Sequence, residues 1–186
     1  MRRILVPTDG SQHAKAALKV ACDLAQANEA QLLLFHVLLR KKEAKDIIAM
    51  PEFSRLDAAV DEELRDVLKR APLPHDVAEV MADPDAPDRP APADVLEALS
   101  EVILNAATAE CVTRGIAAQR LKPGDGEPAA AILDAARTGD ADTIVMGSRG
   151  LGELEAFTFG SVSHKVARDA AAFVISVHAG PGSRPK

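Results

Sequence analysis

Residues 143–163 read TIVMGSRGLGELEAFTFGSVS, and this stretch decides the fold class. It opens with a short apolar run typical of a buried strand, passes through a glycine-rich loop, and ends where apolar residues recur at helical spacing. A strand that leads into glycines and then a helix can hold a phosphate, because glycines let the backbone approach the anion and unpaired helix N–H groups point at it. The glycines are spaced Gly147-x2-Gly150-x9-Gly160-Ser161.

Strand and helix patterns alternate outward from this stretch along the whole chain. The sequence predicts strands at residues 4–6, 32–37, 116–121, 143–146 and 173–177. Such alternation favours a parallel sheet with helices on both faces, and the crossover rules favour an open five-stranded, Rossmann-like α/β fold with strand order 3-2-1-4-5. The first and fourth strands are neighbours in this order. The loops that follow Val6 and Met146 should therefore meet at the crevice where open α/β sheets bind ligands.

Four residues predict where helices begin and end. Ser11 is a candidate N-cap, and Pro128 suits the first turn of a helix. Asp94, with Glu97 three residues later, resembles a capping box at the start of a long helix. Gly139 suits a helix end.

Composition and charge limit the class of protein. A chain of 186 residues with 47% hydrophobic and 27% charged residues fits one globular domain with room for an extension. The formal net charge of -6 argues against nucleic acid as a partner, because phosphate backbones attract basic surfaces. Neither a signal peptide nor a membrane-spanning segment is expected, which favours a cytoplasmic location.

The cysteines and histidines show no metal-ligand spacing. Cys22 and Cys111 are interpreted as buried apolar residues in a reducing compartment. His36, within an apolar run, is more typical of a satisfied core or strand-end histidine than of a ligand. His13, His75 and His178 share no spacing that would indicate a metal site.

At the loop after residues 4–6 and at the glycine-rich loop after residues 143–146, the sequence resembles the universal stress protein family. The resemblance is carried by ILVPTDGS at residues 4–11, VMGSRG at 145–150 and GSVSHKV at 160–166, and it covers roughly residues 2–40 and 94–178. The glycine spacing matches that of family members that bind ATP. The resemblance implies one domain over residues 1–178, with an insertion at about 41–93 and a flexible tail at 179–186.

The chain departs from the family in three places. The segment at 41–93 is longer than is typical, and residues 172–174 read AFV where members often carry Cys-Pro. The glycine loop holds Glu153 and Glu155, whose charges would repel a polyphosphate.

The candidate nucleotide site combines chemistry read from the residues with roles implied by the resemblance. The Asp9 carboxylate can accept hydrogen bonds from ribose hydroxyls, or it can satisfy N–H groups of its own turn. Met146 either covers the base or belongs to the core. The resemblance places backbone near the adenine at Pro7, Thr8 and Val37. The full predicted set is Pro7, Thr8, Asp9, Val37, Met146, Gly147, Ser148, Arg149, Gly150, Gly160, Ser161, Val162 and Ser163.

Within this set the glycines are positions of close backbone approach to phosphate, and Ser161 and Ser163 add hydroxyl and N–H donors. Arg149 can reach a phosphate or remain a solvated loop charge. The loop is not a Walker A motif, since it has no Gly-Lys-Ser/Thr, and the chain lacks a dinucleotide-binding GxGxxG with an acidic partner.

The leading hypothesis is a stress-response regulatory module that binds ATP, or ADP or AMP, with Mg²⁺, and signals by occupancy as a homodimer. The dimer would form through the last strand, Phe173 to Val177. A further protein partner is expected, but its identity is unknown. Two alternatives stay open: a nucleotide-independent interaction module that uses the insertion and dimer surface, and a slow ATPase. An adenylating enzyme is a weaker alternative, because residues 7–11 read PTDGS in place of Ser-Gly-Gly-x-Asp-Ser.

Overall fold

The computed structural model describes residues 1–38, 93–148 and 161–178. The predicted tail lies outside these residues, as does the predicted insertion except for Ala93. The elements in chain order are β1 (Arg3–Pro7), α1 (Gln12–Asn28), β2 (Gln31–Phe35), β3 (Val37–Leu38), α5 (Ala93–Thr113), β4 (Ala118–Arg120), β5 (Gly124–Asp125), α6 (Pro128–Thr138), β6 (Thr143–Gly147), α7 (Ser161–Asp169) and β7 (Phe173–Val177).

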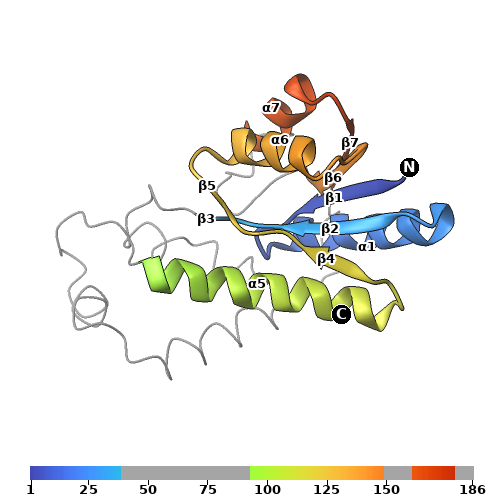
Figure 1. The fold of residues 1–186 in the computed structure, drawn as a ribbon, viewed down its shortest axis with the longest axis horizontal. Coiled ribbons are helices and arrows are strands. Elements are labelled where there is room, and N and C mark those ends of the chain that lie inside the picture. The colour runs from blue at the N-terminus through green and yellow to red at the C-terminus, as the bar shows by residue number, and fades with distance from the viewer. Residues whose placement is uncertain (39–92, 149–160, 179–186) are drawn as a thin grey trace, which may run out of the picture.

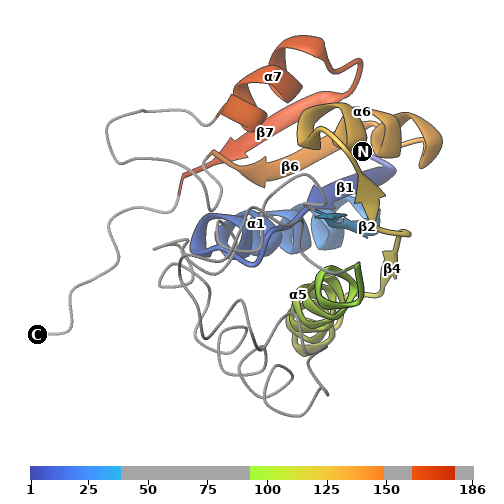
Figure 2. The same ribbon diagram turned by 90° about the vertical axis from the view of Figure 1, so that its left-hand side faces the viewer.

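Five of the strands form one parallel sheet in the order β4-β2-β1-β6-β7, which confirms the predicted order 3-2-1-4-5. Helices α1 and α5 cover one face of the sheet, and α6 and α7 cover the other (Figures 1 and 2). Pro7 of β1 pairs with Phe35 of β2, and Gly147 of β6 pairs with Val177 of β7. These registers bring the carboxyl ends of the strands to one edge of the sheet.

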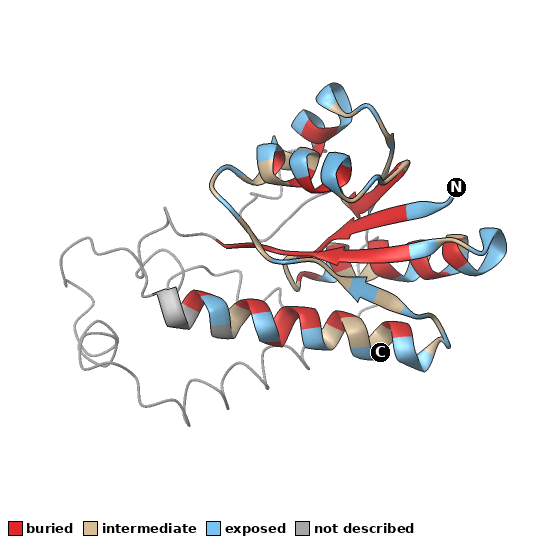
Figure 3. Ribbon diagram, in the orientation of Figure 1, coloured by how far each residue is buried: buried red, intermediate tan, exposed pale blue. Residues whose placement is uncertain are grey.

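Two apolar cores lie on opposite faces of the sheet, and alternate residues of each central strand enter one or the other. In β1, Ile4 and Val6 pack with α1 and α5, whereas Leu5 packs with α6 and α7. All three side chains are fully buried, as the central strands of Figure 3 are. Burial of one such side chain contributes about 1.5–3 kcal/mol. Burial on both faces explains why these strands are continuous apolar runs instead of alternating ones.

The strand predicted at residues 32–37 is divided in the structure. β2 ends at Phe35, and after His36 the chain forms β3, which pairs with β5 in a separate two-stranded parallel sheet. The Gly124 N–H donates to the His36 carbonyl over 2.8 Å, and a Cβ atom at Gly124 would lie 2.5 Å from the Phe35 ring. The break depends on this contact with a distant segment, so the unbroken apolar run carries no sign of it.

The predicted helix ends are close to those observed. Ser11 caps α1, since its hydroxyl accepts the Ala14 N–H over 3.1 Å, and Pro128 is the first residue of α6. Helix α5 begins one residue before Asp94. Gly139 does follow α6, but it is right-handed, and Asp140 carries the positive φ of 52°. A Cβ at Gly139 would lie 2.9 Å from the Ala135 carbonyl oxygen, so close packing accounts for that glycine.

Candidate functional site

The candidate site lies at the carboxyl ends of β1 and β6, which are adjacent parallel strands. The loop at residues 8–11 connects β1 to α1, and a second loop begins at Ser148 after β6. Figure 2 shows the two strands side by side between the helical layers. The structure therefore brings the loop at residues 8–11 and Ser148, the first residue after β6, to one edge. Three predicted site residues, Arg149, Gly150 and Gly160, lie outside the described residues.

The main chain of Thr8 makes two hydrogen bonds to the end of β2 and the residue after it. Its N–H donates to the Phe35 carbonyl, and its own carbonyl accepts a hydrogen bond from Nδ1 of His36, each over 2.8 Å. The Thr8 hydroxyl accepts the Gly10 N–H over 3.3 Å, and Gly10 has a φ of 80°, a conformation that glycine adopts without steric cost. The loop after β1 is thus built from local hydrogen bonds that turn the chain into α1.

Asp9 takes part in the same turn. Its Oδ1 atom accepts the Ser11 N–H over 3.0 Å, which is the turn-forming role considered for it from the sequence. The residue is partly exposed, whereas Pro7 and Thr8 before it are buried. A carboxylate offers about four lone-pair positions, so the turn bond and a contact to ribose hydroxyls are compatible.

His36, between β2 and β3, is buried with 6% of its surface exposed, and its ring supports the loop at residues 8–11. Burial lowers the pKa of His36, while the hydrogen bond to Thr8 and the negative charge of Asp9 act in the opposite direction. The neutral ring with its proton on Nδ1 satisfies the Thr8 carbonyl. This geometry confirms the interpretation of His36 as a satisfied strand-end histidine.

The loop after β6 is anchored by Ser148, which is buried and contacts two other elements. Its N–H donates to the Val177 carbonyl at the end of β7, and its carbonyl accepts the Ser163 hydroxyl of α7, each over 2.8 Å. The Ser148 hydroxyl lies 3.1 Å from Nδ1 of His178. The Ser163 hydroxyl therefore orients the first turn of α7 against β6. Ser161, the first residue of α7, is exposed, and Val162 is half-buried.

Met146 and Val37 place their side chains in the core. Both belong to the cluster that packs with α6 and α7, with 6% and 9% exposed surface. For Met146 this is the core alternative considered from the sequence. For Val37 the result agrees with a role through main-chain atoms. Gly147, half-buried at the end of β6, lies next to Ser148 at the same edge.

One contact near this edge was missed by the sequence analysis. His13 in the first turn of α1 and His178 after β7 have ring centroids 5.3 Å apart, with the planes at 61°. Their spacing along the chain gives no sign of this, but both residues adjoin carboxyl ends of strands. In α7, Nζ of Lys165 lies 3.5 Å from Oε2 of Glu127, the N-cap of α6.

The described ranges contain neither a membrane-spanning helix nor a cluster of metal ligands. No helix there has both the length and the apolar character needed to span a membrane. Within the same ranges, no three His, Cys, Asp or Glu side chains gather as metal ligands.

Comparison with known proteins identifies relatives that match almost the entire chain. The model of the universal stress protein family matches residues 1–178. The universal stress protein in the QAH/OAS sulfhydrylase 3' region of Thermus aquaticus is 34% identical over 176 residues, which is 95% of this chain and 98% of the relative. Universal stress protein YxiE of Bacillus subtilis (strain 168) is 28% identical over 170 residues, with coverages of 89% and 91%.

Solved structures share the fold. Universal stress protein UspA from Lactobacillus plantarum has a TM-score of 0.61 at 20% identity, covering 95% of this chain and 97% of its own. A universal stress protein in complex with cAMP has a TM-score of 0.57 at 21% identity, with coverages of 96% and 98%. A family protein from Arabidopsis thaliana with AMP bound has a TM-score of 0.57 at 16% identity, with coverages of 97% and 93%. With the family model matching residues 1–178 and a relative at 34% identity, the chain belongs to the universal stress protein family.

Proposed function

We propose that this protein binds an adenine nucleotide at the carboxyl edge of β1 and β6 and acts as a nucleotide-binding regulatory module. The observation that carries the proposal is that residues 8–11 and Ser148 directly follow the carboxyl ends of β1 and β6, which are neighbouring parallel strands. Ligands of open α/β sheets bind at such a switch point. Structural neighbours with cAMP and AMP support adenine as the base.

In this proposal the three parts of the nucleotide meet different groups. The adenine lies against main chain at Pro7, Thr8 and Val37, and the ribose hydroxyls donate to the carboxylate of Asp9. The phosphates lie near the N-terminus of α7 at Ser161, where helix N–H groups and the dipole favour negative charge. The predicted loop residues Arg149, Gly150 and Gly160 complete the phosphate contacts.

The nucleotide we favour is ATP with Mg²⁺, with ADP and AMP as the alternatives. A triphosphate would carry its negative charge towards Glu153 and Glu155 of the loop sequence, and a Mg²⁺ ion bound to the phosphates would offset that repulsion. The hydrogen bonds of Ser148 to Val177 and Ser163 offer a route by which occupancy of the loop affects the β7 edge. We propose that the protein signals in this way as a homodimer.

The first experiment is to denature freshly purified protein and identify any released small molecule by mass spectrometry. A roughly stoichiometric adenine nucleotide would support the proposal, and its ATP to ADP ratio would bear on slow hydrolysis. If the protein is empty, calorimetric titration with Mg²⁺-ATP, ADP and AMP follows. An empty protein that binds none of them would contradict the proposal and favour the nucleotide-independent interaction module.

Substitution of Asp9 tests where the nucleotide binds. Asp9→Ala removes the carboxylate and should weaken binding by about 1–3 kcal/mol. Asp9→Asn keeps an oxygen that can accept the Ser11 N–H, so the turn is preserved and only the charge is lost. This variant should therefore weaken binding less than Asp9→Ala. Asp134→Ala on the exposed face of α6 changes the net charge equally and is the matched control. Unchanged affinity in both Asp9 variants would remove Asp9 from the site.

A further inference from the structure

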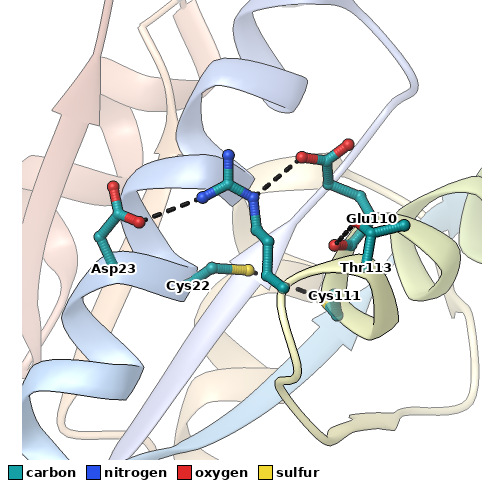
Figure 4. Close-up of polar contacts among 6 residues, drawn as sticks. Cys22, Asp23, Glu110, Cys111 and Thr113 are labelled. Carbon is teal, nitrogen blue, oxygen red and sulfur yellow. Dashed lines mark hydrogen bonds and ion pairs between the residues drawn. The ribbon is translucent and has the colours of Figure 1, made fainter.

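Two cysteines that are far apart in the sequence face each other between α1 and α5. Cys22 and Cys111 are separated by 89 positions, yet their Sγ atoms lie 3.8 Å apart. The residues have 1% and 0% of their surface exposed and belong to the core on that face of the sheet. The structure confirms that both are buried and unpaired by a disulfide, and Figure 4 shows that their side chains point at one another.

A charged cluster lies beside the thiols. The Arg114 guanidinium contacts Oδ1 of Asp23 over 3.1 Å and Oε1 of Glu110 over 3.0 Å. Each carboxylate is the sequence neighbour of one cysteine, so the arginine joins the same two helices that the thiols join. In Figure 4 dashed lines join Asp23 and Glu110 to the guanidinium that lies between them.

The two thiols have unequal acidity. The hydrogen bond between the two thiols lowers the pKa of Cys22, and burial opposes this effect. The positive charge of Arg114 lowers the pKa further, whereas the carboxylates of Glu110 and Asp23 raise it. The same hydrogen bond, together with burial, raises the pKa of Cys111. Cys22 is therefore the more acidic of the two thiols, and the thiolate is the form that reacts with oxidants.

We propose that Cys22 and Cys111 form a redox-sensitive pair that a hydroperoxide oxidises to an intramolecular disulfide between α1 and α5. The Cys22 thiolate attacks the peroxide, the O–O bond breaks, and the products are a sulfenic acid at Cys22 and an alcohol or water. The Cys111 sulfur then attacks the sulfenic sulfur, the S–O bond breaks, and water leaves. In sum, two thiols lose two electrons and two protons, and one hydroperoxide is reduced to an alcohol and water.

The geometry needs little change for this step. A disulfide brings its sulfurs to about 2 Å, so rotation of the two side chains must close a gap of under about 2 Å from the observed 3.8 Å. Cys111 lies in the last turn of α5, two residues before the helix ends at Thr113, and its neighbour Val112 is 66% exposed. Opening of this one turn would uncover Cys111 and, behind it, the Cys22 sulfur 3.8 Å away, because terminal turns open at low free energy.

The test uses the full-length protein, reduced, freed of reductant and treated with increasing hydrogen peroxide. Before alkylation, the oxidised monomer should be about 2 Da lighter than the reduced protein. After denaturation and alkylation, neither thiol should carry the label. Trypsin should yield peptide 20–40 joined to peptide 71–114, since these contain Cys22 and Cys111. The melting temperature should rise by about 5–10 °C and return on treatment with dithiothreitol, because the bond closes a long loop.

Single variants assign the order of the steps. In Cys111→Ala, Cys22 should form a sulfenic acid that dimedone traps, and in Cys22→Ala the remaining thiol should react several-fold more slowly. Arg114→Gln should slow oxidation of the parent pair by about three- to tenfold through loss of positive charge, while the final disulfide still forms. Circular dichroism of each reduced variant checks that it is folded.

The parent protein alone can overturn the proposal. If both thiols remain fully alkylatable after excess peroxide, or if the products are only sulfinic acid or intermolecular dimers, no switch exists at this pair.

Discussion

At the scale of single residues, His36 best shows how packing sets chemistry. The ring occupies a position with 6% exposure between β2 and β3, and its Nδ1–H satisfies the Thr8 carbonyl at the candidate site. A protonated ring would keep that bond but would place a charge in an apolar surrounding. Burial therefore lowers the pKa of His36 below its ordinary value of about 6.5.

This lowered pKa predicts a dependence of stability on pH. Above about pH 6.5 the ring is neutral in both the folded and the unfolded chain, so His36 does not change how the free energy of unfolding varies with pH. Below that pH the unfolded chain takes up the proton first, and the free energy of unfolding falls by up to about 1.4 kcal/mol per pH unit until the folded protein is also protonated. His36→Asn keeps an N–H donor without titrating, so chemical denaturation between pH 7.5 and 5.5 should show a shallower fall.

The matched control is His164→Asn, because His164 is exposed on α7. It should keep the slope of the parent protein. Equal slopes for the parent and His36→Asn would show that His36 does not titrate differently on folding.

At the scale of elements, the helix ends share one device. Beyond α1, α5 and α6 a residue with positive φ turns the chain, and the next N–H donates to the carbonyl five residues earlier. The residues with positive φ are Glu29, Gly115 and Asp140, and only one of them is the glycine that this conformation favours. A non-glycine residue in the left-handed region is strained by about 1–2 kcal/mol.

At these helix ends, two substitutions should change the free energy of unfolding in opposite directions. Gly115→Ala should lower the free energy of unfolding by about 1 kcal/mol, although a Cβ there meets no atom within 4 Å, because the backbone φ of 69° is unfavourable for alanine. Glu29→Gly should raise it by about 0.5–1 kcal/mol. Urea denaturation measures both changes, and a Gly115→Ala protein as stable as the parent would show that the turn tolerates a side chain.

At the scale of the whole molecule, β7 is an edge strand of the sheet formed by the described residues. It pairs with β6 on one side, and its residues are partly exposed, with Phe173 at 77%. An apolar edge strand is suited to pairing with another chain. The prediction of a homodimer through Phe173–Val177 stays a prediction, now located on a strand that the structure places at the edge.

Val174 provides the test of this dimer. Val174→Glu puts a negative charge on each copy of the edge strand, and like charges across a two-fold interface repel, so light scattering should show a shift from dimer to monomer. Val112→Glu makes the same change at an exposed site on α5 and should leave the mass unaltered. A parent protein that is monomeric, or a Val174→Glu protein of unchanged mass, would contradict the model of the dimer.

The sequence predicted the parts of the fold that follow from local pattern. Apolar runs buried on both faces located the three central strands, β1, β2 and β6, and alternation with helices led to the order 3-2-1-4-5. Ser11 and Pro128 marked helix starts because capping depends on residues within one turn. The glycine spacing identified the family that the family model then matched over residues 1–178.

The tertiary structure alone decided which distant residues meet. The strand breaks at His36, whose carbonyl accepts the Gly124 N–H. The Cys22 sulfur contacts Cys111, and the His13 ring contacts His178. Hydrophobic periodicity states which face of an element is buried, because that depends only on spacing along the chain. It does not state which side chain of another element lies opposite, because that depends on how two helices or strands are set against each other when the core closes.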